Sequence, residues 1–351
     1  MNRTTSKNSA RAARIRRRKR KRIMKTILLL LLMAVLAGGG GYLVYTLNMG
    51  ALAELPETFR ASREFSGSDL SVDQKRAKSF AADLCVVEED VPLDSVSLES
   101  GQSGLLFDLS NKKVLYSNGT YNRVYPASIT KIMTAMLALK YGNMDETVTI
   151  TQENVTLEEG SQVCGFQAGD RLTLDQLVHC LLVYSGNDAA SAIAEYVGGS
   201  TSNFVDMMNS YAAKLGCTGT HFTNPHGLQD ENHYTTPYDI YLMLKEALKY
   251  PEFTEITQLS SYTVEYTRAD GSQMATYLDA TDHYLTGEAS TPRDVTILGG
   301  KTGTTSEAGN CLALLSQNAY GNPYISIVMG ASSKELLYQQ MSSLLVNING
   351  N

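Results

Sequence analysis

Hydrophobic and polar positions divide the chain into three parts. Residues 26–53 contain no charged side chain and include the apolar run TILLLLLMAVLAGGGGYLVYTL over 26–47. Residues 48–95 are polar and acidic, which predicts a stalk. From Ser103 onward, short apolar runs alternate with turn residues, as is typical of a globular domain, and we place that domain over residues 96–351.

Within this domain, strand patterns flank a helical middle. The runs GLLFDL and KVLY lie on either side of the turn SNKK and predict a β-hairpin over 104–116. Helical spacing dominates from residue 127 to 250, and later patterns predict strands over 295–305, 310–317 and 323–331 and a closing helix over 334–348. This order predicts an α+β fold, with an antiparallel sheet flanked by helices and an all-α subdomain.

In the helical middle, two helices meet at a tight loop. Thr173 and Gln176 have the spacing of a capping box in front of an apolar helix face. The sequence Ser185-Gly186-Asn187 then interrupts the helical pattern. We therefore expect this loop to project a hydroxyl and an amide between two helices.

The net charge of -6 conceals an uneven distribution. Residues 1–25 hold twelve Lys and Arg and no acid, whereas the rest of the chain holds 18 basic and 36 acidic groups. A basic flank before an apolar segment indicates a membrane anchor over 26–47 with a cytoplasmic N-terminus, since about 20 apolar residues span a bilayer. Nucleic-acid binding by the basic tail is disfavoured, because phosphate would repel the acidic remainder. We expect a single-pass protein of the cell membrane with an extracytoplasmic domain.

A cleavable signal peptide is the alternative to a retained anchor. Val35-Leu36-Ala37 precedes Gly38 as small residues precede a cleavage site. The long basic region and the apolar continuation YLVYTL favour retention. A lipid-modified cysteine is excluded, because no cysteine lies near this segment.

The five cysteines are widely scattered and lack the spacing of a metal site. Their odd number argues against a complete disulfide framework. We interpret them as buried or free thiols, with at most one disulfide: Cys85, Cys164, Cys180, Cys217 and Cys311.

Two S-x-x-K motifs occur in the chain, and their contexts differ. Ser110 and Lys113 lie in the predicted hairpin turn, where lysines are solvated. Ser128 and Lys131 follow Pro126 at the start of the apolar helical run IMTAMLAL. Residues three positions apart share a helix face, so Lys131 should stand beside the Ser128 hydroxyl.

The apolar setting of Lys131 changes its expected chemistry. Desolvation by neighbours such as Ile132 and Met133 would lower the pKa of the ammonium and favour a neutral amine, which can accept the serine proton. The helix start also offers backbone N–H groups where an oxyanion would form. Taken alone, the pair also fits an ordinary N-terminal serine beside a lysine whose stem lies along apolar surface.

Two further elements favour the catalytic interpretation. Ser185-Gly186-Asn187 lies 57 residues after Ser128, and Lys301-Thr302-Gly303 lies another 116 residues on, in a predicted strand. Glycines around that strand allow close approach of a peptide backbone, as in strand addition. A polar loop and an edge strand protected by lysine are the structural alternatives. All three elements in this order are unlikely to occur by chance.

These elements resemble those of the serine D-alanyl-D-alanine carboxypeptidases, which are low-molecular-mass penicillin-binding proteins related to class A β-lactamases. The resemblance runs from Ser103 to Ser333 and rests on VYPASITKIMTAML, LLVYSGNDAASAIAEYVGGS, FTNPHGLQDENHYTTPYDI and GGKTGTTSEAGNCLAL. It implies a β-lactamase/transpeptidase-like fold and a penicillin-binding catalytic domain over 96–351.

By matching position, the resemblance implies three catalytic residues and, in Asn187, a substrate-binding one. Ser128 would be the nucleophile and Lys131 its general base. Ser185 would relay a proton to the leaving amine. Asn187 would hold both the substrate amide and the lysine.

The third motif would bind substrate. The resemblance implies that Lys301 and the hydroxyls of Thr302 and Thr304, on either side of Gly303, hold the terminal carboxylate of the peptide. Lys301 and these hydroxyls would also polarise the Ser185 hydroxyl. The backbone N–H groups of Ser128 and Thr304 would form the oxyanion hole.

Two features depart from the family pattern. Only 48 residues follow Gly303, so we expect them to complete the catalytic sheet without a second β-rich domain, and we expect the anchor to be N-terminal instead of C-terminal. The basic residue that some members carry after the last strand has no clear match here. Lys334 is the nearest candidate.

His226, His233 and Asp230 could suggest a metal site. Their spacing in a loop matches none of the usual zinc patterns. We therefore expect no metal and no other cofactor.

The resemblance implies a serine D,D-carboxypeptidase that removes the terminal D-alanine of peptidoglycan stem pentapeptides through an acyl-enzyme and is inhibited by β-lactam antibiotics. The alternatives are a β-lactamase, a D,D-endopeptidase or transpeptidase, and an inactive penicillin-binding sensor or scaffold. The intact motifs argue against the inactive protein. The β-lactamase pattern E-x-x-L-N has no counterpart between the second and third motifs, where the nearest acids are Asp230 and Glu231.

Overall fold

The computed structural model describes Lys25 and residues 83–349. The predicted basic tail and membrane anchor, apart from Lys25, and the predicted stalk up to residue 82 lie outside the described residues. Within the described part, no helix is long and apolar enough to cross a membrane. Residues 83–349 belong to one compact unit.

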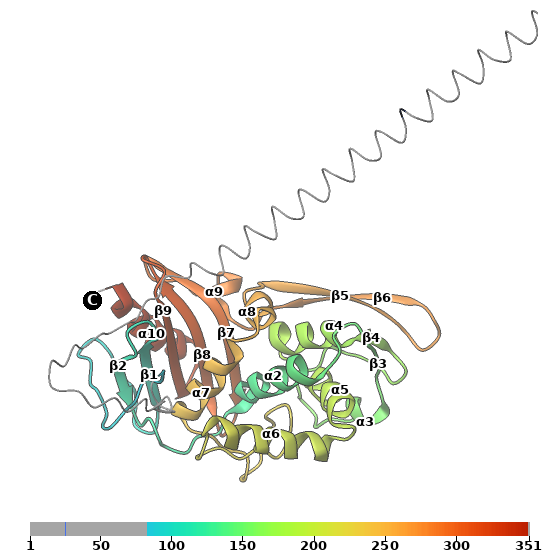
Figure 1. The fold of residues 1–351 in the computed structure, drawn as a ribbon, viewed down its shortest axis with the longest axis horizontal. Helices are drawn as coiled ribbons and strands as arrows, with labels where there is room; N and C mark the ends of the chain where they lie inside the picture. The colour runs from blue at the N-terminus through green and yellow to red at the C-terminus, as the bar shows by residue number, and fades with distance from the viewer. Residues whose placement is uncertain (1–24, 26–82, 350–351) are drawn as a thin grey trace, which may run out of the picture. The chain divides into compact units, whose positions relative to one another are not determined.

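A five-stranded antiparallel sheet forms one side of this unit (Figure 1). In spatial order its strands are β2 (Lys113–Asn118), β1 (Ser103–Asp108), β9 (Pro323–Ala331), β8 (Gly309–Asn318) and β7 (Val295–Thr305). The predicted hairpin and the three predicted C-terminal strands are confirmed. β7 is at the edge of the sheet, so one side of its backbone has no strand partner among the described residues.

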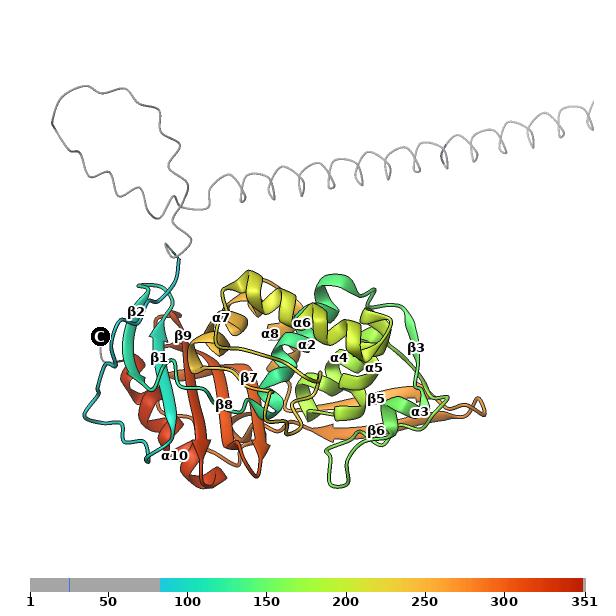
Figure 2. The same cartoon turned by 90° about the horizontal axis from the view of Figure 1, so that it is seen from below.

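Alternating side chains give each face of the sheet its own core. Leu105 and Phe107 of β1 pack with the helical part of the molecule, which includes α7 (Pro237–Ala247) and α8 (Pro251–Thr257). Leu106 packs on the other face with α10 (Lys334–Leu345). Figure 2 shows α7 and α10 on opposite sides of the strands. The predicted closing helix is confirmed, and it ends in a short 3-10 turn, η3 (Val346–Asn349).

The helical subdomain is organised around α2 (Lys131–Tyr141), whose first eight residues are all buried. A helix that is buried on every side belongs to the centre of a core, and this position explains the apolar run after Ser128. The elements around it are α3 (Gln152–Val155), α4 (Leu174–His179), the π-helical turn η2 (Cys180–Tyr184), α5 (Asn187–Gly198) and α6 (Thr201–Leu215). Thr173 and Gln176 form the predicted capping box at the start of α4.

A small antiparallel sheet lies beside these helices and was not predicted. Its strands are β3 (Thr147–Thr149), β4 (Arg171–Thr173), β5 (Ser261–Thr267) and β6 (Gln273–Asp279). The short helix α9 (His283–Thr286) then leads into β7. The α+β fold is confirmed, but the helical subdomain also contains strands.

The predicted boundary between stalk and domain at residue 96 is wrong. Cys85 and Val87 are buried in the main core. The Cys85 N–H donates to the Tyr241 hydroxyl at 2.9 Å, and the Ser117 N–H donates to the Val91 carbonyl at 2.9 Å. Residues 83–95 therefore belong to the folded domain, because they fill its core and satisfy its polar groups.

Candidate active site

Ser128 lies in a short 3-10 helix, η1 (Ala127–Thr130), that leads directly into α2. Pro126 is its N-cap, with φ of -75°, a value that the proline ring favours. Side chains at positions i and i+3 of a 3-10 helix are eclipsed, so Ser128 and Lys131 stand one above the other. The predicted helix start is confirmed, with a first turn that is tighter than an α-helix.

The Lys131 side chain is fully buried. Its Nζ lies 2.8 Å from Ser128 Oγ, 2.7 Å from Asn187 Oδ1 and 2.7 Å from the His226 carbonyl oxygen. Burial and the nearby charge of Lys301 hold the pKa of Lys131 well below its usual range. A neutral amine can donate its two N–H groups to the amide and carbonyl oxygens and direct its lone pair at the serine hydroxyl. This arrangement can act as a base toward Ser128.

The loop 185–187 lies between η2 and α5, as predicted. Ser185 has φ of 70°, in the left-handed region that residues other than glycine seldom occupy. This conformation ends the π-helical turn and brings the hydroxyl within 2.9 Å of Lys301 Nζ, which donates to it. Asn187 begins α5 and accepts from Lys131 through its amide oxygen. One short loop thus contacts both buried lysines.

Strand β7 carries Lys301 and Gly303 on the side that faces the helical subdomain, because alternate residues of a strand share a face. Lys301 is almost fully buried. Burial lowers its pKa to about 7, and the Asp282 carboxylate opposes this shift. Near neutral pH this lysine can therefore either donate or accept a proton.

Thr302 and Thr304 lie on the same strand and line the cavity described below. Thr302 Oγ1 is 2.5 Å from Thr281 Oγ1, and the Thr304 hydroxyl donates to Asn310 Oδ1 at 3.2 Å. These bonds orient two hydroxyls at the open edge of the sheet, where an anionic group of a ligand could bind.

Two glycines allow backbone segments to pack against the turn that carries Ser128. A Cβ at Gly303 would lie 2.9 Å from the Ser128 nitrogen and 3.0 Å from the Pro126 oxygen. A Cβ at Gly227 would lie 1.8 Å from the Ala127 oxygen. Strand β7 and the loop around Gly227 therefore hold the turn from two directions.

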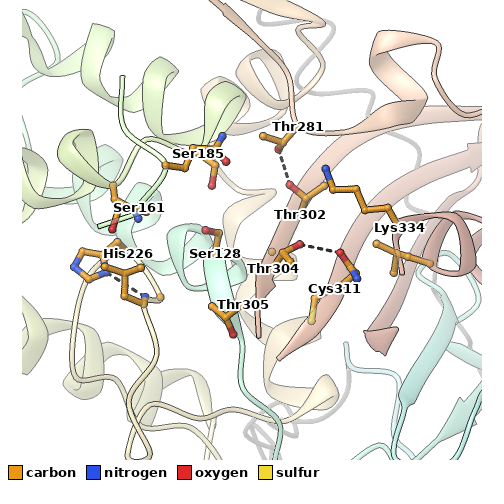
Figure 3. Close-up of a pocket in the computed structure, with 18 of the residues that line it drawn as sticks. Ser128, Ser161, Ser185, His226, Thr281, Thr302, Thr304, Thr305, Cys311 and Lys334 are labelled. Atoms are coloured by element: carbon orange, nitrogen blue, oxygen red, sulfur yellow. Dashed lines mark hydrogen bonds between the residues drawn. The ribbon is translucent and has the colours of Figure 1, made fainter. Parts of the chain in front are cut away.

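A cavity of about 310 Å³ opens over these residues. Figure 3 shows Ser128 between the loop that carries His226 and the strand that carries Thr302 and Thr304. Lys334, at the start of α10, is exposed and lines the same cavity. The candidate basic residue after the last strand therefore lies at the site.

Burial is the main influence on the pKa of both His226 and His233. Burial and the nearby Lys131 lower the pKa of His226 to about 3, and burial lowers the pKa of His233 to about 4. Asp230 accepts from the backbone N–H of Asn232. In residues 83–349, no group of three or more His, Cys, Asp or Glu side chains is arranged to hold a metal ion. All five cysteines are buried and free of disulfides.

The second S-x-x-K motif has none of these features. Ser110 is exposed in the turn after β1, and Lys113 is exposed at the start of β2. The predicted difference between the two motifs is confirmed for their environments.

Two contributions to the site were not predicted. The carbonyl of His226 accepts from Lys131, and a backbone carbonyl leaves no signal in a sequence. The buried Asp188 carboxylate accepts from the backbone N–H groups of Cys164 and Gly165, each at 3.0 Å. Its place directly after Ser185-Gly186-Asn187, at a helix start, is a signal that could have indicated this role.

Comparison with known proteins identifies the family. The sequence profile of the D-alanyl-D-alanine carboxypeptidases, peptidase family S11, matches residues 93–333. The chain is 33% identical over 263 residues to the D-alanyl-D-alanine carboxypeptidase DacF of Bacillus subtilis, covering 74% of this chain and 64% of DacF. It is 31% identical to the D-alanyl-D-alanine carboxypeptidase DacC of Escherichia coli, covering 76% of this chain and 64% of DacC. The chain thus spans less than two thirds of these relatives.

The fold is also similar to solved structures. The crystal structure of the DD-transpeptidase of Streptomyces K15 matches with a TM-score of 0.63 at 28% identity. The match covers 70% of this chain and 95% of the transpeptidase. The β-lactamase/transpeptidase-like fold predicted from the motifs is confirmed.

Proposed function

The chain belongs to the family of D-alanyl-D-alanine carboxypeptidases, and on this basis we propose that it is a serine D,D-carboxypeptidase acting on peptidoglycan stem pentapeptides. The observation that carries this proposal is the buried Lys131 amine, 2.8 Å from Ser128 Oγ and supplied with two other oxygen acceptors. Burial and the charge of Lys301 favour the neutral amine that a serine nucleophile needs as its base, and the two other acceptors orient that amine toward Ser128.

In the proposed acylation step, Lys131 takes the Ser128 proton and Oγ attacks the carbonyl of the penultimate D-alanine. The N–H groups of Ser128 and Thr304 stabilise the oxyanion. The C–N bond then breaks, and the leaving D-alanine amine takes a proton through the Ser185 hydroxyl, which accepts from Lys301. Water finally hydrolyses the ester and releases the shortened peptide.

We assign recognition of the terminal carboxylate to β7. Thr302 and Thr304 present hydroxyls at the cavity, and Lys301 supplies positive charge behind them. Asn187 holds the substrate amide as well as Lys131. Lys334 adds an exposed ammonium at the same cavity, where a carboxylate gains from a charge-assisted hydrogen bond.

β-Lactam antibiotics should acylate Ser128 as substrate analogues. The side chains that line the cavity in the described part of the chain include hydroxyls, amides, imidazoles and Lys334, and none is Asp or Glu. A β-lactamase of class A uses a glutamate to activate the deacylating water. A long-lived penicillin adduct is therefore expected, and rapid multiple turnover of penicillin would favour the β-lactamase alternative.

We further propose that residues 26–47 anchor the chain in the cell membrane with the N-terminus cytoplasmic and the catalytic domain outside. The uncharged apolar segment and the twelve basic residues before it support this topology. Alkaline extraction of membranes tests the proposal, because an anchored chain stays in the pellet. A mature protein that begins at Gly38 would show a cleaved signal peptide instead.

Mass spectrometry of a pentapeptide ending in D-Ala-D-Ala, incubated with the purified chain, tests the proposed activity. We expect the loss of one alanine, unaffected by a metal chelator and abolished by Ser128→Ala. Alanine release by Ser128→Ala, or its loss on chelation, would contradict the serine mechanism.

A further inference from the structure

A chain of three hydrogen bonds leads from the loop at 223 to the peptide group in front of Ser128. The backbone N–H of Thr223 donates to His233 Nδ1 at 3.0 Å. His233 Nε2 lies 2.8 Å from Thr130 Oγ1. The Thr130 hydroxyl donates to the Ala127 carbonyl at 2.8 Å.

The direction of these bonds follows from the first donor. A backbone N–H can only donate, so His233 Nδ1 must accept and the neutral ring carries its proton on Nε2. Nε2–H then donates to Thr130 Oγ1, which leaves the threonine proton for the Ala127 carbonyl. His233 is buried, and the low pKa that burial gives it is consistent with a neutral ring. Each donor of these three hydrogen bonds therefore has one acceptor.

The last acceptor belongs to the peptide group that contains the Ser128 N–H. A peptide group is planar, so fixing the Ala127 oxygen fixes the direction of the Ser128 N–H on the opposite side. Ala127 itself has φ of 47°, a conformation that a residue with a side chain adopts only when its surroundings impose it. Hydrogen bonding at the carbonyl also polarises the peptide and strengthens its N–H as a donor.

We call this series of hydrogen bonds, from Thr223 through His233 and Thr130 to Ala127, the relay. Its histidine end is also held in place. Val124 and Thr235 form a pair of backbone hydrogen bonds, each 2.9 Å, which ties the segment before Ser128 to the segment after His233. His233 packs edge-on against the Phe222 ring, with 5.5 Å between ring centres. The relay therefore joins two segments of backbone whose separation is fixed.

We propose that His233 and Thr130 are positioning residues that aim the Ser128 N–H at the oxyanion of the acyl-transfer reaction. This inference rests on the proposed function, because it requires an acyl-enzyme at Ser128. Neither side chain touches the substrate. Both act through the Ala127–Ser128 peptide group.

The test compares three purified full-length variants in reaction with benzylpenicillin. Thr130→Val removes the hydroxyl and keeps the shape, whereas Thr130→Ser keeps the hydroxyl. Thr134→Val is the matched control, since the buried Thr134 hydroxyl donates to the Pro225 carbonyl at 2.6 Å, one helical turn away. It removes a hydrogen bond of the same kind from a carbonyl outside the Ala127–Ser128 peptide.

Two readouts separate positioning from stability. In Thr130→Val the Ser128 N–H should be misdirected, which should slow acylation about 10-fold; complete loss of an oxyanion donor would slow it more. Thr130→Ser should restore the rate. The carbonyl stretching band of the acyl-enzyme, identified with a ¹³C-labelled penicillin, should move to higher frequency in Thr130→Val alone. Thr134→Val should lower the melting temperature without moving the band.

His233 is tested by non-additivity. His233→Leu should slow acylation as Thr130→Val does, and the double variant should lose no more than either single variant. His233→Gln, which keeps an N–H near the Nε2 position, should restore part of the rate. Additive losses would overturn the relay. If His233→Leu does not fold, the comparison of Thr130→Val with Thr130→Ser alone decides whether the relay positions Ser128.

The outcomes also separate this inference from the proposed function. If Thr130→Val reacts with penicillin at the wild-type rate and its acyl-enzyme has the wild-type carbonyl frequency, the relay is overturned and the serine mechanism stays intact. A wild-type chain that penicillin does not label would overturn both.

Discussion

At the residue scale, two buried lysines differ in their contacts and therefore in their expected chemistry. Lys131 contacts the Ser128 hydroxyl and two oxygens that can only accept, an amide oxygen and a backbone carbonyl. Lys301 contacts the Ser185 hydroxyl and the backbone carbonyl of Thr302. The sequence predicted the Lys131–Ser128 pair because apolar neighbours and three-residue spacing are visible in it. It could not predict the His226 carbonyl or the left-handed Ala127, because both depend on the path of the backbone.

Replacing Lys131 by alanine should abolish acylation of the chain by a fluorescent penicillin, because Ser128 then has no proton acceptor. In the wild-type chain, acylation should be lost as the pH falls through the lowered pKa of Lys131, since only the deprotonated amine is a base. Gel fluorescence across a pH series measures both effects, with circular dichroism to check folding. Lys113→Ala is the control and should be labelled normally; equal loss in the two variants would refute the choice of Lys131.

At the element scale, the site is the meeting point of η1, the loop after η2 and edge strand β7. The hairpin β1–β2 and strands β7 to β9 were predictable because apolar runs and turns mark them clearly. The small sheet was not, because β3 and β4 have three residues each and carry little periodicity. The alternation in β5, with Val264 and Tyr266 buried and Glu265 exposed, is a signal that could have found it.

Gly303→Ala should impair acylation while the chain stays folded. Its Cβ would meet the backbone of Ser128 and Pro126, and the resulting shift of the nucleophile should slow acylation by about 100-fold. Stopped-flow measurement with a chromogenic β-lactam provides the rate. Gly271→Ala is the control, because Gly271 has φ of 86° in open space and its substitution should cost about 1 to 2 kcal/mol of stability without a clash. An unchanged rate in Gly303→Ala would show that β7 does not hold the turn.

At the scale of the whole molecule, the folded domain starts earlier than the sequence suggested. The polar composition of residues 83–95 resembles a stalk, yet Cys85 and Val87 fill the core beside Tyr241. Two buried residues in a polar segment leave too weak a pattern to mark a domain boundary.

A chain that begins at Asp83 should be soluble and as active as the full-length chain. A chain that begins at Val96 should be less stable, because it lacks Val87, whose burial alone contributes about 2 kcal/mol. It also leaves the Ser117 N–H without its acceptor, the Val91 carbonyl. Thermal unfolding measures the difference, and equal melting temperatures would show that residues 83–95 add nothing to the fold.

The central claim is that Ser128 is the nucleophile of an acyl-enzyme, and the position of a penicillin adduct tests it most directly. Trypsin should release residues 124–131, VYPASITK, in which Ser128 is the single serine. Tandem mass spectrometry of the chain after brief reaction with benzylpenicillin should find the adduct on this peptide, at Ser128. An adduct confined to another peptide, or an equal yield of adduct from Ser128→Ala, would contradict the account.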